Sequence, residues 1–335
     1  KEDYLMGINF SRLLSLKYGN AISNYLGSKY QAISVGRVMT CVLGMVVRRE
    51  REIREFVKTP FYRVLGSFLA GGHPFDGEWR AVEGSRYFQS PYLYKENGFK
   101  EKKYAKELKA ILSAHPPYKA VVEKIEKKKE NKNPPLLFNL AELQNECSRM
   151  FKISPDETLK IVQELYEKKL VTYPRTDARV LSTAVAKEIH KNIGGLRGYV
   201  HGKGFAEEIL AEGSYKNLAK TRYVNDKQIT DHYAIIPTGQ GMGALGSLHP
   251  SAAKVYETVV RRFLSIFYPP AVYQKVSIVS VIEKERLFSS FKILVSEGYL
   301  KVVQNSFAKK KEESAQEEGE QTEDTSFLEI LQTIK

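Results

Sequence analysis

The sequence predicts an α+β fold of several domains, because segments with helical spacing of apolar residues alternate along the chain with segments that read as strands. Helical spacing is clearest from Thr40 to Phe56 and from Pro250 to Phe267. The alternation expected of a strand is clearest from Val272 to Ile282. A chain of 335 residues has room for about two or three domains, each with its own core.

Composition narrows the class of protein. The chain carries 52 Lys and Arg residues against 39 Asp and Glu, a formal net charge of +13. Such a charge favours polyanionic partners, nucleic acid above all, although a basic surface can also serve solubility alone. Cys41 and Cys147 are too few for a disulfide framework or a four-cysteine zinc site, so we expect a reducing compartment. No apolar run reaches the ~20 residues of a membrane span, and no signal peptide opens the chain, so we expect no membrane partner.

The first 58 residues read as helical. From Thr40 to Phe56, apolar residues recur at helical spacing with charged residues between them, and Pro60 ends the pattern. The residues after Lys1 are already patterned like the middle of a protein, which predicts that this chain is a piece of a longer one.

A β-rich segment follows. Residues 61–69 predict a strand, Gly71-Gly72 a turn, and residues 78–82 a returning strand. In the lysine-rich stretch that follows, residues 105–112 and 121–125 predict short helices, and residues 127–135 a polar linker at a domain boundary. Because residues 272–282 and 287–295 again read as strands, we expect the second β segment to complete the first, with a helical domain inserted between them.

The clearest helix start in the inserted region is at Ser154. A Ser cap, Pro155 at the first helical position and Glu157 three residues after the Ser form a capping box. The helix leads into the segment LVTYPRTD at residues 170–177. Pro174 forbids helical continuation there and favours an extended backbone.

Tyr173 and Arg175 are the first candidates for chemistry. They lie two residues apart on an extended segment, so both side chains can point to one side. A phenol can act as a covalent nucleophile, and a guanidinium can hold two phosphate oxygens. The alternative is structural: the Tyr173 ring packs under a loop while Arg175 pairs with Asp177.

Three motifs in order resemble the type IA DNA topoisomerases. ELYEKKLVTYPRTDARVLS resembles the stretch in which the family's nucleophilic tyrosine lies in a TY-x-R-[ST]-D context. SVGRVMT is similar to the S-[AV]-G-R-V-Q-[ST] segment that lines the single-strand groove, and ITDHYAIIPTG resembles the [DE]-x-H-x-A-I-x-P-[ST] block. The resemblance covers about residues 3–303 and leans towards the topoisomerase III branch.

The resemblance assigns roles to residues of this chain. It implies that Tyr173 is the nucleophile, that Arg175 clamps the scissile phosphate and that His232 hydrogen-bonds it. Without the motif, His232 would read as a histidine near a core strand at Ile235. The residues that the resemblance places against DNA are Ser34, Val35, Gly36, Arg37, Val38, Met39, Thr176 and Asp177. Met39 departs from the family, which usually has Gln there, so one polar contact to DNA is in doubt.

The implied reaction cuts and rejoins single-stranded DNA through a 5′-phosphotyrosine, without ATP, and so relaxes or decatenates DNA. The family binds Mg²⁺ in a TOPRIM domain with a D-x-D-x-E triad, which this sequence lacks, so we expect no metal ligands in this chain. The fragment alone would then be inactive or weak, and the alternative function is a single-stranded DNA-binding module without catalysis. The implied setting is the bacterial cytoplasm and nucleoid, with a helicase as a candidate partner.

The implied fold is a toroid of helical domains and a β-rich arch. Residues 1–58 would form part of the helical DNA-groove domain, and residues 59–133 with 270–308 the arch. Residues 134–269 would be the inserted helical domain that carries Tyr173. Residues 309–335 would be a mobile acidic loop and a truncated C-terminal segment.

Two other classes of tyrosine enzyme that break DNA fit poorly. Relaxases need a His-x-His metal site, and tyrosine recombinases need His-x-x-Arg. None of the six histidines of the sequence lies in either pattern.

Overall fold

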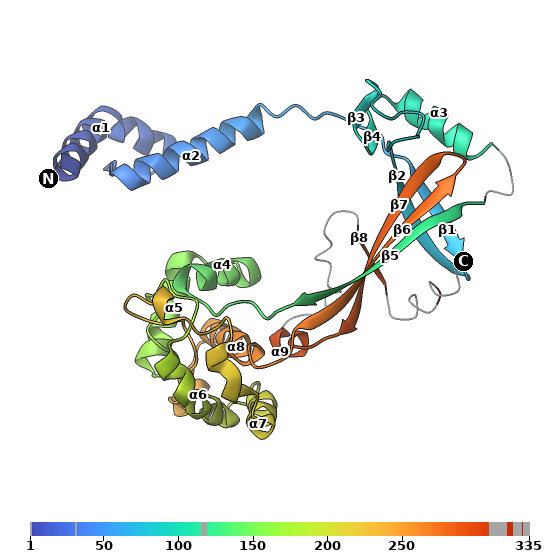
Figure 1. Cartoon of the computed structure of the whole chain (residues 1–335). Coiled ribbons are helices and arrows are strands. Elements are labelled where there is room, and N and C mark those ends of the chain that lie inside the picture. The colour runs from blue at the N-terminus through green and yellow to red at the C-terminus, as the bar shows by residue number, and fades with distance from the viewer. Residues whose placement is uncertain (1, 31, 115–118, 308–319, 324–329, 331–335) are drawn as a thin grey trace. The chain divides into compact units, whose positions relative to one another are not determined.

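The computed structural model describes residues 2–30, 32–114, 119–307, 320–323 and 330. The chain divides into two compact units, Lys1–Phe61 and Tyr62–Lys335. The α-helices, labelled in Figure 1, are α1 (Glu2–Leu26), α2 (Arg37–Arg54), α3 (Lys102–Leu112), α4 (Leu140–Phe151), α5 (Pro155–Glu167), α6 (Thr183–Gly195), α7 (Lys203–Glu212), α8 (Pro250–Ser265) and α9 (Leu300–Val303). The strands are β1 (Leu65–Ala70), β2 (His73–Arg80), β3 (Leu93–Lys95), β4 (Gly98–Phe99), β5 (Val121–Lys132), β6 (Ala271–Ile282), β7 (Glu285–Ser296) and β8 (Glu320–Glu323).

The first unit consists of α1 and α2, which confirms the helical reading of these residues. The segment between the helices is fixed along α1 by two serine side chains. Ser11 Oγ accepts a hydrogen bond from the backbone N–H of Val35 at 2.8 Å, and Ser15 Oγ accepts one from Ile33 at 2.7 Å. These bonds hold the chain extended up to the first residue of α2.

The second unit contains an antiparallel sheet in the order β1-β2-β7-β6-β5, visible as the long twisted strands of Figure 1. Trp79 on β2 lies opposite Leu287 on β7, and Lys128 on β5 lies opposite Lys275 on β6. Strands from before residue 133 therefore pair with strands from after residue 270. This pairing confirms that the second β segment completes the first.

Two expectations in the lysine-rich stretch were wrong. Residues 121–125 form the start of strand β5 instead of a helix, and Lys127–Lys132 continue the strand instead of forming a linker. The reason is tertiary, because β5 pairs with β6 from Val121 to Lys132 and gains hydrogen bonds that no local pattern reveals. Strand β5 is also at the edge of the sheet, where lysines discourage pairing with a second chain.

The expected mobile acidic loop and truncated segment at residues 309–335 lie mostly outside the described residues. Within that range, Glu320–Glu323 form β8, which pairs parallel to β7 from Ser290 to Ile293. This short segment is therefore a strand instead of part of a loop.

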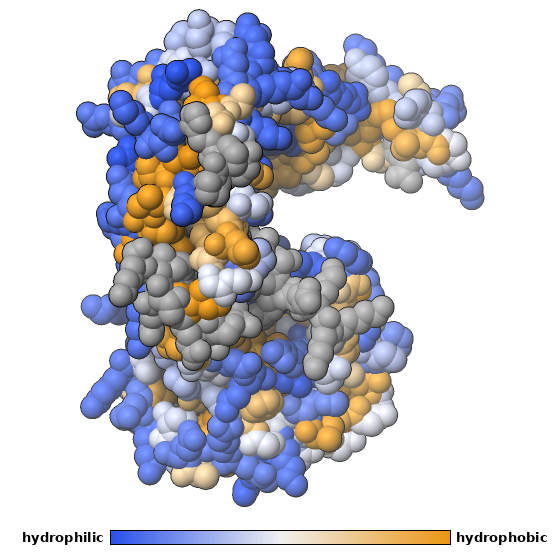
Figure 2. Space-filling model, turned by 90° about the vertical axis from the view of Figure 1, so that its right-hand side faces the viewer, coloured by the Kyte–Doolittle hydropathy of each residue, from blue (hydrophilic) through white to orange (hydrophobic). Residues whose placement is uncertain are grey.

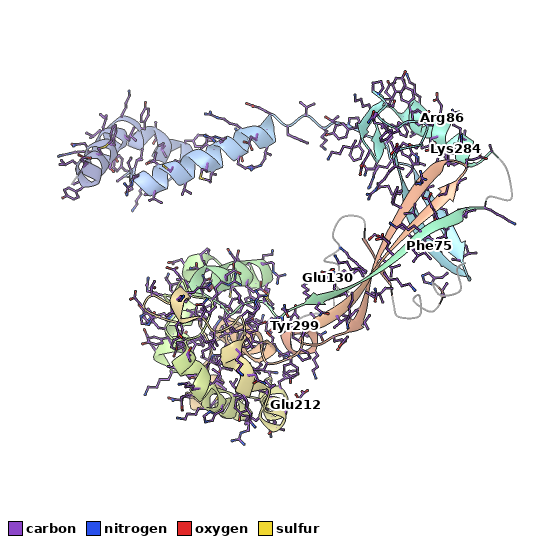
Figure 3. The ribbon with its side chains drawn as sticks, in the orientation of Figure 1. Phe75, Arg86, Glu130, Glu212, Lys284 and Tyr299 are labelled. Carbon is purple, nitrogen blue, oxygen red and sulfur yellow. The ribbon has the colours of Figure 1, made fainter. Side chains whose placement is uncertain are left out.

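An aromatic cluster fills one end of the sheet. The rings of Trp79 and Phe99 stack at 5.1 Å between centroids, and Trp79 is fully buried. Glu285 is buried beside them, and its carboxylate accepts hydrogen bonds from Trp79 Nε1 at 2.6 Å and from the backbone N–H of Arg86 at 2.8 Å. Figure 3 labels Arg86 at this end of the sheet.

Helices α4 to α9 surround a larger core that includes residues from the base of the sheet. The expected start of α5 is confirmed, because Ser154 Oγ accepts a hydrogen bond from the Glu157 N–H at 3.1 Å. Tyr299, labelled in Figure 3, lies just after β7, is buried in this core and donates its backbone N–H to Pro269 O at 3.0 Å. On the face shown in Figure 2, hydrophilic residues lie beside apolar areas.

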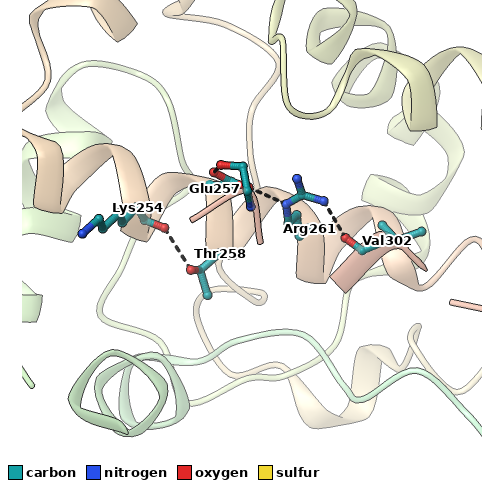
Figure 4. A network of polar contacts seen from close by, with 6 residues as sticks. Lys254, Glu257, Thr258, Arg261 and Val302 are labelled. Carbon is teal, nitrogen blue, oxygen red and sulfur yellow. Dashed lines mark hydrogen bonds and ion pairs between the residues drawn. The ribbon is translucent and has the colours of Figure 1, made fainter. Parts of the chain in front are cut away.

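A buried ion pair ties α8 to the chain that follows β7 (Figure 4). Arg261 Nε donates to the Glu257 carboxylate at 2.6 Å, and Arg261 Nη1 donates to Val302 O at 3.0 Å. Ser306 donates to the same carboxylate from its backbone N–H at 2.7 Å and from its hydroxyl at 2.6 Å. Burial alone would raise the pKa of Glu257, but the bonds from Ser306 and Arg261 outweigh it and hold the pKa below its ordinary value.

We expect Glu257→Gln to lower the free energy of unfolding at pH 7 by about 3–5 kcal/mol, because it leaves the buried Arg261 without its counter-charge. Since the pKa of Glu257 is lower in the folded protein, the wild type should lose this stabilisation as the pH falls from the ordinary glutamate pKa of ~4.3 through the folded value. Urea denaturation between pH 7 and pH 3 measures both effects.

The control is Asp156→Asn, which removes an exposed pair with Lys160 on α5 and should change stability little. Equal losses in the two variants would contradict the role given to the buried pair.

Candidate active site

The segment that carries Tyr173 is held by backbone pairing. After α5, Lys169 adopts a left-handed conformation with φ of 62°, and the chain turns into an extended segment. The Thr172 N–H donates to Ile236 O at 3.0 Å, and the Thr238 N–H donates to Leu170 O at 3.0 Å. Residues 170–172 therefore lie antiparallel to residues 236–238, which brings the TYPRTD and DHYAIIPT motifs side by side.

Two threonine hydroxyls reinforce this pairing. Thr172 Oγ1 donates to Ala234 O and accepts from the Ile236 N–H, each at 3.0 Å. Thr176 Oγ1 donates to His232 O at 2.8 Å and accepts from the Ala178 N–H at 3.1 Å. The Thr176 hydroxyl thus fixes the backbone of His232, and a contact between Thr176 and DNA stays a prediction.

The ring of Tyr173 lies between two other rings. Its centroid is 4.4 Å from that of His232, with the planes tilted by 43°, and 5.5 Å from that of Tyr166 in an edge-on arrangement. Tyr173 is partly exposed, and His232 is exposed. The structure therefore brings together the predicted nucleophile and the predicted phosphate-binding histidine, with both side chains open to a ligand.

Arg175 and Asp177 are exposed on the same segment. Within the described part of the chain, Arg175 has no ion-pair or hydrogen-bond partner, so the alternative in which it pairs with Asp177 is not observed. The backbone carbonyl of Asp177 accepts a hydrogen bond from Asn139 Nδ2 at 3.0 Å, which fixes the end of the motif to the start of α4. The guanidinium of Arg175 remains available to an anion.

Other potential nucleophiles in this unit are less accessible. Burial raises the pKa of the Cys147 thiol to about 12 and the pKa of the Tyr223 phenol to about 12. Burial also raises the pKa of Tyr199 and Tyr256, both of which lie in the core. These four groups lie in the core, whereas the Tyr173 phenol is partly exposed.

The other predicted DNA-binding residues lie in the first unit. Gly36 is the extended N-cap of α2, with φ of −148°, and no side chain caps the helix. Arg37 is the first residue of α2, no acidic residue lies in the first turn, and the three residues from Arg37 to Met39 are exposed. Ser34 is exposed and Val35 is half-buried. A helix N-terminus without a side-chain cap, next to an exposed basic residue, suits a phosphate.

The described residues contain no group of three or more His, Cys, Asp or Glu side chains that could hold a metal ion. That Mg²⁺ is bound by residues outside this chain stays a prediction. In the same described part of the chain, none of the helices has the length and apolar character needed to cross a membrane.

Thr172 and Tyr166 contribute to the site but were not singled out from the sequence. Thr172 directly precedes Tyr173, and its alternation with Tyr173 on an extended segment could have marked it as the side chain facing the protein. Tyr166 has no comparable signal, because it reads as one more apolar position of the α5 stripe.

A family model for DNA topoisomerases matches residues 1–333, and the chain belongs to this family. It is similar to DNA topoisomerase 3 of Bacillus licheniformis, at 31% identity over 96% of this chain and 39% of that protein. It is also 31% identical to DNA topoisomerase 3 of Salmonella typhimurium, over 89% of this chain and 43% of that protein. The predicted resemblance to the type IA enzymes, and to their topoisomerase III branch, is therefore confirmed.

A solved structure shows the same fold. Full-length topoisomerase I from Thermotoga maritima aligns over 92% of this chain and 47% of its own length, with a TM-score of 0.56 and 24% identity. This confirms the predicted α+β class. The chain spans about two fifths of the length of the curated relatives that it matches.

We expect Thr172→Val to lower the free energy of unfolding by about 1–3 kcal/mol, because it leaves the buried Ile236 N–H without an acceptor. Thr172→Ser keeps the hydroxyl and should lose clearly less. Urea denaturation of the two variants beside the wild type makes the measurement. Equal losses would mean that the methyl group matters and the hydroxyl does not.

Proposed function

We propose that this chain is part of a type IA DNA topoisomerase that cuts and rejoins single-stranded DNA through a covalent bond between DNA and Tyr173. The observation that carries the proposal is the placement of the Tyr173 ring 4.4 Å from the His232 ring, on two motifs joined by hydrogen bonds, beside the unpaired Arg175 of the described structure. Membership of the family supports the reaction class.

In the proposed cleavage step, Tyr173 Oη attacks the phosphorus of one phosphodiester. A bond forms between the phenol oxygen and phosphorus, and the bond from phosphorus to the 3′-oxygen breaks. The phenol proton is lost and the 3′-oxygen gains one, so the products are a 5′-phosphotyrosine and a free 3′-hydroxyl. Since one phosphodiester replaces another of similar energy, the reverse step rejoins the strand without ATP.

Arg175 and His232 would act on the charge of the phosphate. Arg175 is exposed next to Pro174 and has the planar fork that holds two phosphate oxygens. His232 is exposed against the Tyr173 ring and can donate a hydrogen bond to a phosphate held at the phenol. The hydroxyls of Thr172 and Thr176 would position these groups through their bonds to the backbone of residues 232–236.

The first unit would bind the single-stranded DNA at phosphates other than the one that is cleaved. The backbone turn at Gly36 and the exposed Arg37 at the start of α2 are suited to a phosphate, and Ser34, Val35, Val38 and Met39 line the same turn. We further propose the domain roles stated above: residues 1–58 in the groove domain, 59–133 with 270–308 in the arch, and 134–269 as the inserted domain.

The wider setting is also part of the proposal. As the resemblance to the type IA enzymes implies, Mg²⁺ would be held by a TOPRIM domain outside this chain. The whole protein would relax or decatenate DNA in the bacterial cytoplasm, at the nucleoid, with a helicase as a candidate partner. The chain alone would bind single strands and cleave poorly.

We expect Tyr173→Phe to abolish the covalent protein–DNA adduct, because the phenol oxygen is the proposed nucleophile. The assay incubates an end-labelled single-stranded oligonucleotide with Mg²⁺ and with a longer form of the protein that extends over the length of its relatives. A denaturing gel then separates the adduct from free DNA. Tyr166→Phe is the matched control, because its ring packs against Tyr173 and it should still form the adduct.

An adduct that survives Tyr173→Phe would refute the nucleophile assignment. If neither the chain nor the longer form gives an adduct, but both bind single strands, the alternative function of a DNA-binding module holds.

We expect Arg37→Ala to weaken binding of single-stranded DNA and to reduce the slope of log affinity against log salt concentration by about 0.7, the value for one lost phosphate contact. Arg49→Ala is the control, because Arg49 pairs with Glu52 on the exposed side of the same helix. Fluorescence anisotropy of a labelled oligonucleotide across a salt series measures both. Unchanged affinity of Arg37→Ala at low salt would count against the contact.

A further inference from the structure

A second surface of the molecule combines exposed aromatic rings with basic groups. It lies on the module formed by β3, β4 and α3, at one end of the sheet (Figure 1). We call it the tyrosine–lysine patch, and its residues are Tyr92, Tyr94, Lys100, Lys103 and Tyr104. None of these residues belongs to the candidate active site.

The local structure turns two tyrosines outward. Leu93 packs against the aromatic core of the module, whereas its neighbours Tyr92 and Tyr94 are both exposed. Tyr92 is 45% exposed and Tyr94 is 46% exposed. Tyr92 directly precedes β3 and Tyr94 lies on it, and both large rings are accessible to a ligand.

The Tyr92 ring is packed against a second ring in its exposed position. It stacks on the Tyr104 ring with centroids 4.1 Å apart and planes 20° apart, and Tyr104 in turn contacts the buried Tyr87 edge-on at 6.4 Å. The backbone carbonyl of Tyr92 also accepts a hydrogen bond from the Lys100 N–H at 2.9 Å. A ring that is already immobilised loses little conformational entropy when a ligand stacks on it.

Positive charge surrounds these rings. Lys103 Nζ lies 4.6 Å from the centroid of the Tyr104 ring, and the Lys100 ammonium group is anchored to Pro91 O at 2.8 Å. From Tyr92 to Lys109 the chain has six lysines against three glutamates. One of the glutamates, Glu101, is paired with Lys103. The patch is therefore basic and suited to a polyanion.

We propose that the tyrosine–lysine patch binds single-stranded DNA, with bases stacked on Tyr92 and Tyr94 and phosphates contacted by Lys100 and Lys103. Stacking needs bases whose faces are open, which a single strand offers and a duplex does not. The inference rests on the proposed function only for the identity of the ligand. It adds a contact with single-stranded DNA in a part of the chain that lies outside the active-site motifs.

The test measures binding of a labelled 20-nucleotide oligo(dT) to the full chain. The double variant Tyr92→Leu with Tyr94→Leu should lose at least about fivefold in affinity, since stacking is lost. The control variant Tyr92→Phe with Tyr94→Phe keeps both rings and should stay within about twofold of wild type. Lys100→Gln and Lys103→Gln should each lower the salt slope by about 0.7. Equal affinity of the Leu and Phe variants would overturn the proposal.

A second measurement keeps an aromatic ring at position 92 and follows its fluorescence. The chain has one tryptophan, Trp79, which is fully buried, so Tyr92→Trp adds an exposed fluorescent reporter to the patch. Oligo(dT) should quench the added fluorescence, and a hairpin duplex at equal nucleotide concentration should not. Equal quenching by both, or none by either, would overturn stacking of single-stranded bases.

The two proposals fail in different ways. The Leu double variant should still form the Tyr173 adduct in the longer protein when the oligonucleotide is saturating. If Tyr173 forms no adduct while the Leu variant binds oligo(dT) weakly, the proposed function fails and the patch stands. If the adduct forms and the Leu and Phe variants bind alike, the patch fails and the proposed function stands.

Discussion

The candidate active site depends on the antiparallel pairing of residues 170–172 with residues 236–238. The two segments are far apart in the sequence, and their backbone bonds are reinforced by the hydroxyls of Thr172 and Thr176. Because this network fixes the backbone on both sides of the Tyr173 and His232 rings, it leaves the side chains free for a ligand. Without this network, the two motifs would not be held together, and the Tyr173 and His232 rings would not be placed side by side.

A second constraint is that the sheet is built from two segments that lie far apart in the sequence. Strand β2 pairs with β7, and β5 pairs with β6, so the chain leaves the sheet after Lys132 and returns to it at Ala271. The helical core lies between these points in the sequence and shares residues with the base of the sheet. The buried pair of Glu257 and Arg261 on α8 also binds Val302 and Ser306. These bonds hold the segment that follows β7 against α8.

The two proposed binding surfaces of the second unit use aromatic rings differently. At the candidate active site the Tyr173 ring lies between Tyr166 and His232, and its phenol oxygen is the proposed nucleophile. In the tyrosine–lysine patch the ring faces matter, and Tyr92 is supported from behind by Tyr104. In both arrangements an accessible tyrosine packs on another ring. Such a side chain loses less conformational entropy when it binds a ligand.

The sequence by itself determined the local elements and the identity of the chemical groups. Ser154 starts α5 and Pro174 keeps Tyr173 off a helix, because capping and proline geometry act within a few residues. It could not determine that Val121 to Lys132 form a strand, nor that the Thr176 hydroxyl bonds to His232 O, because both depend on partners more than fifty residues away. Only the tertiary structure decided these, since long-range hydrogen bonds outweigh weak local propensities once the chain is folded.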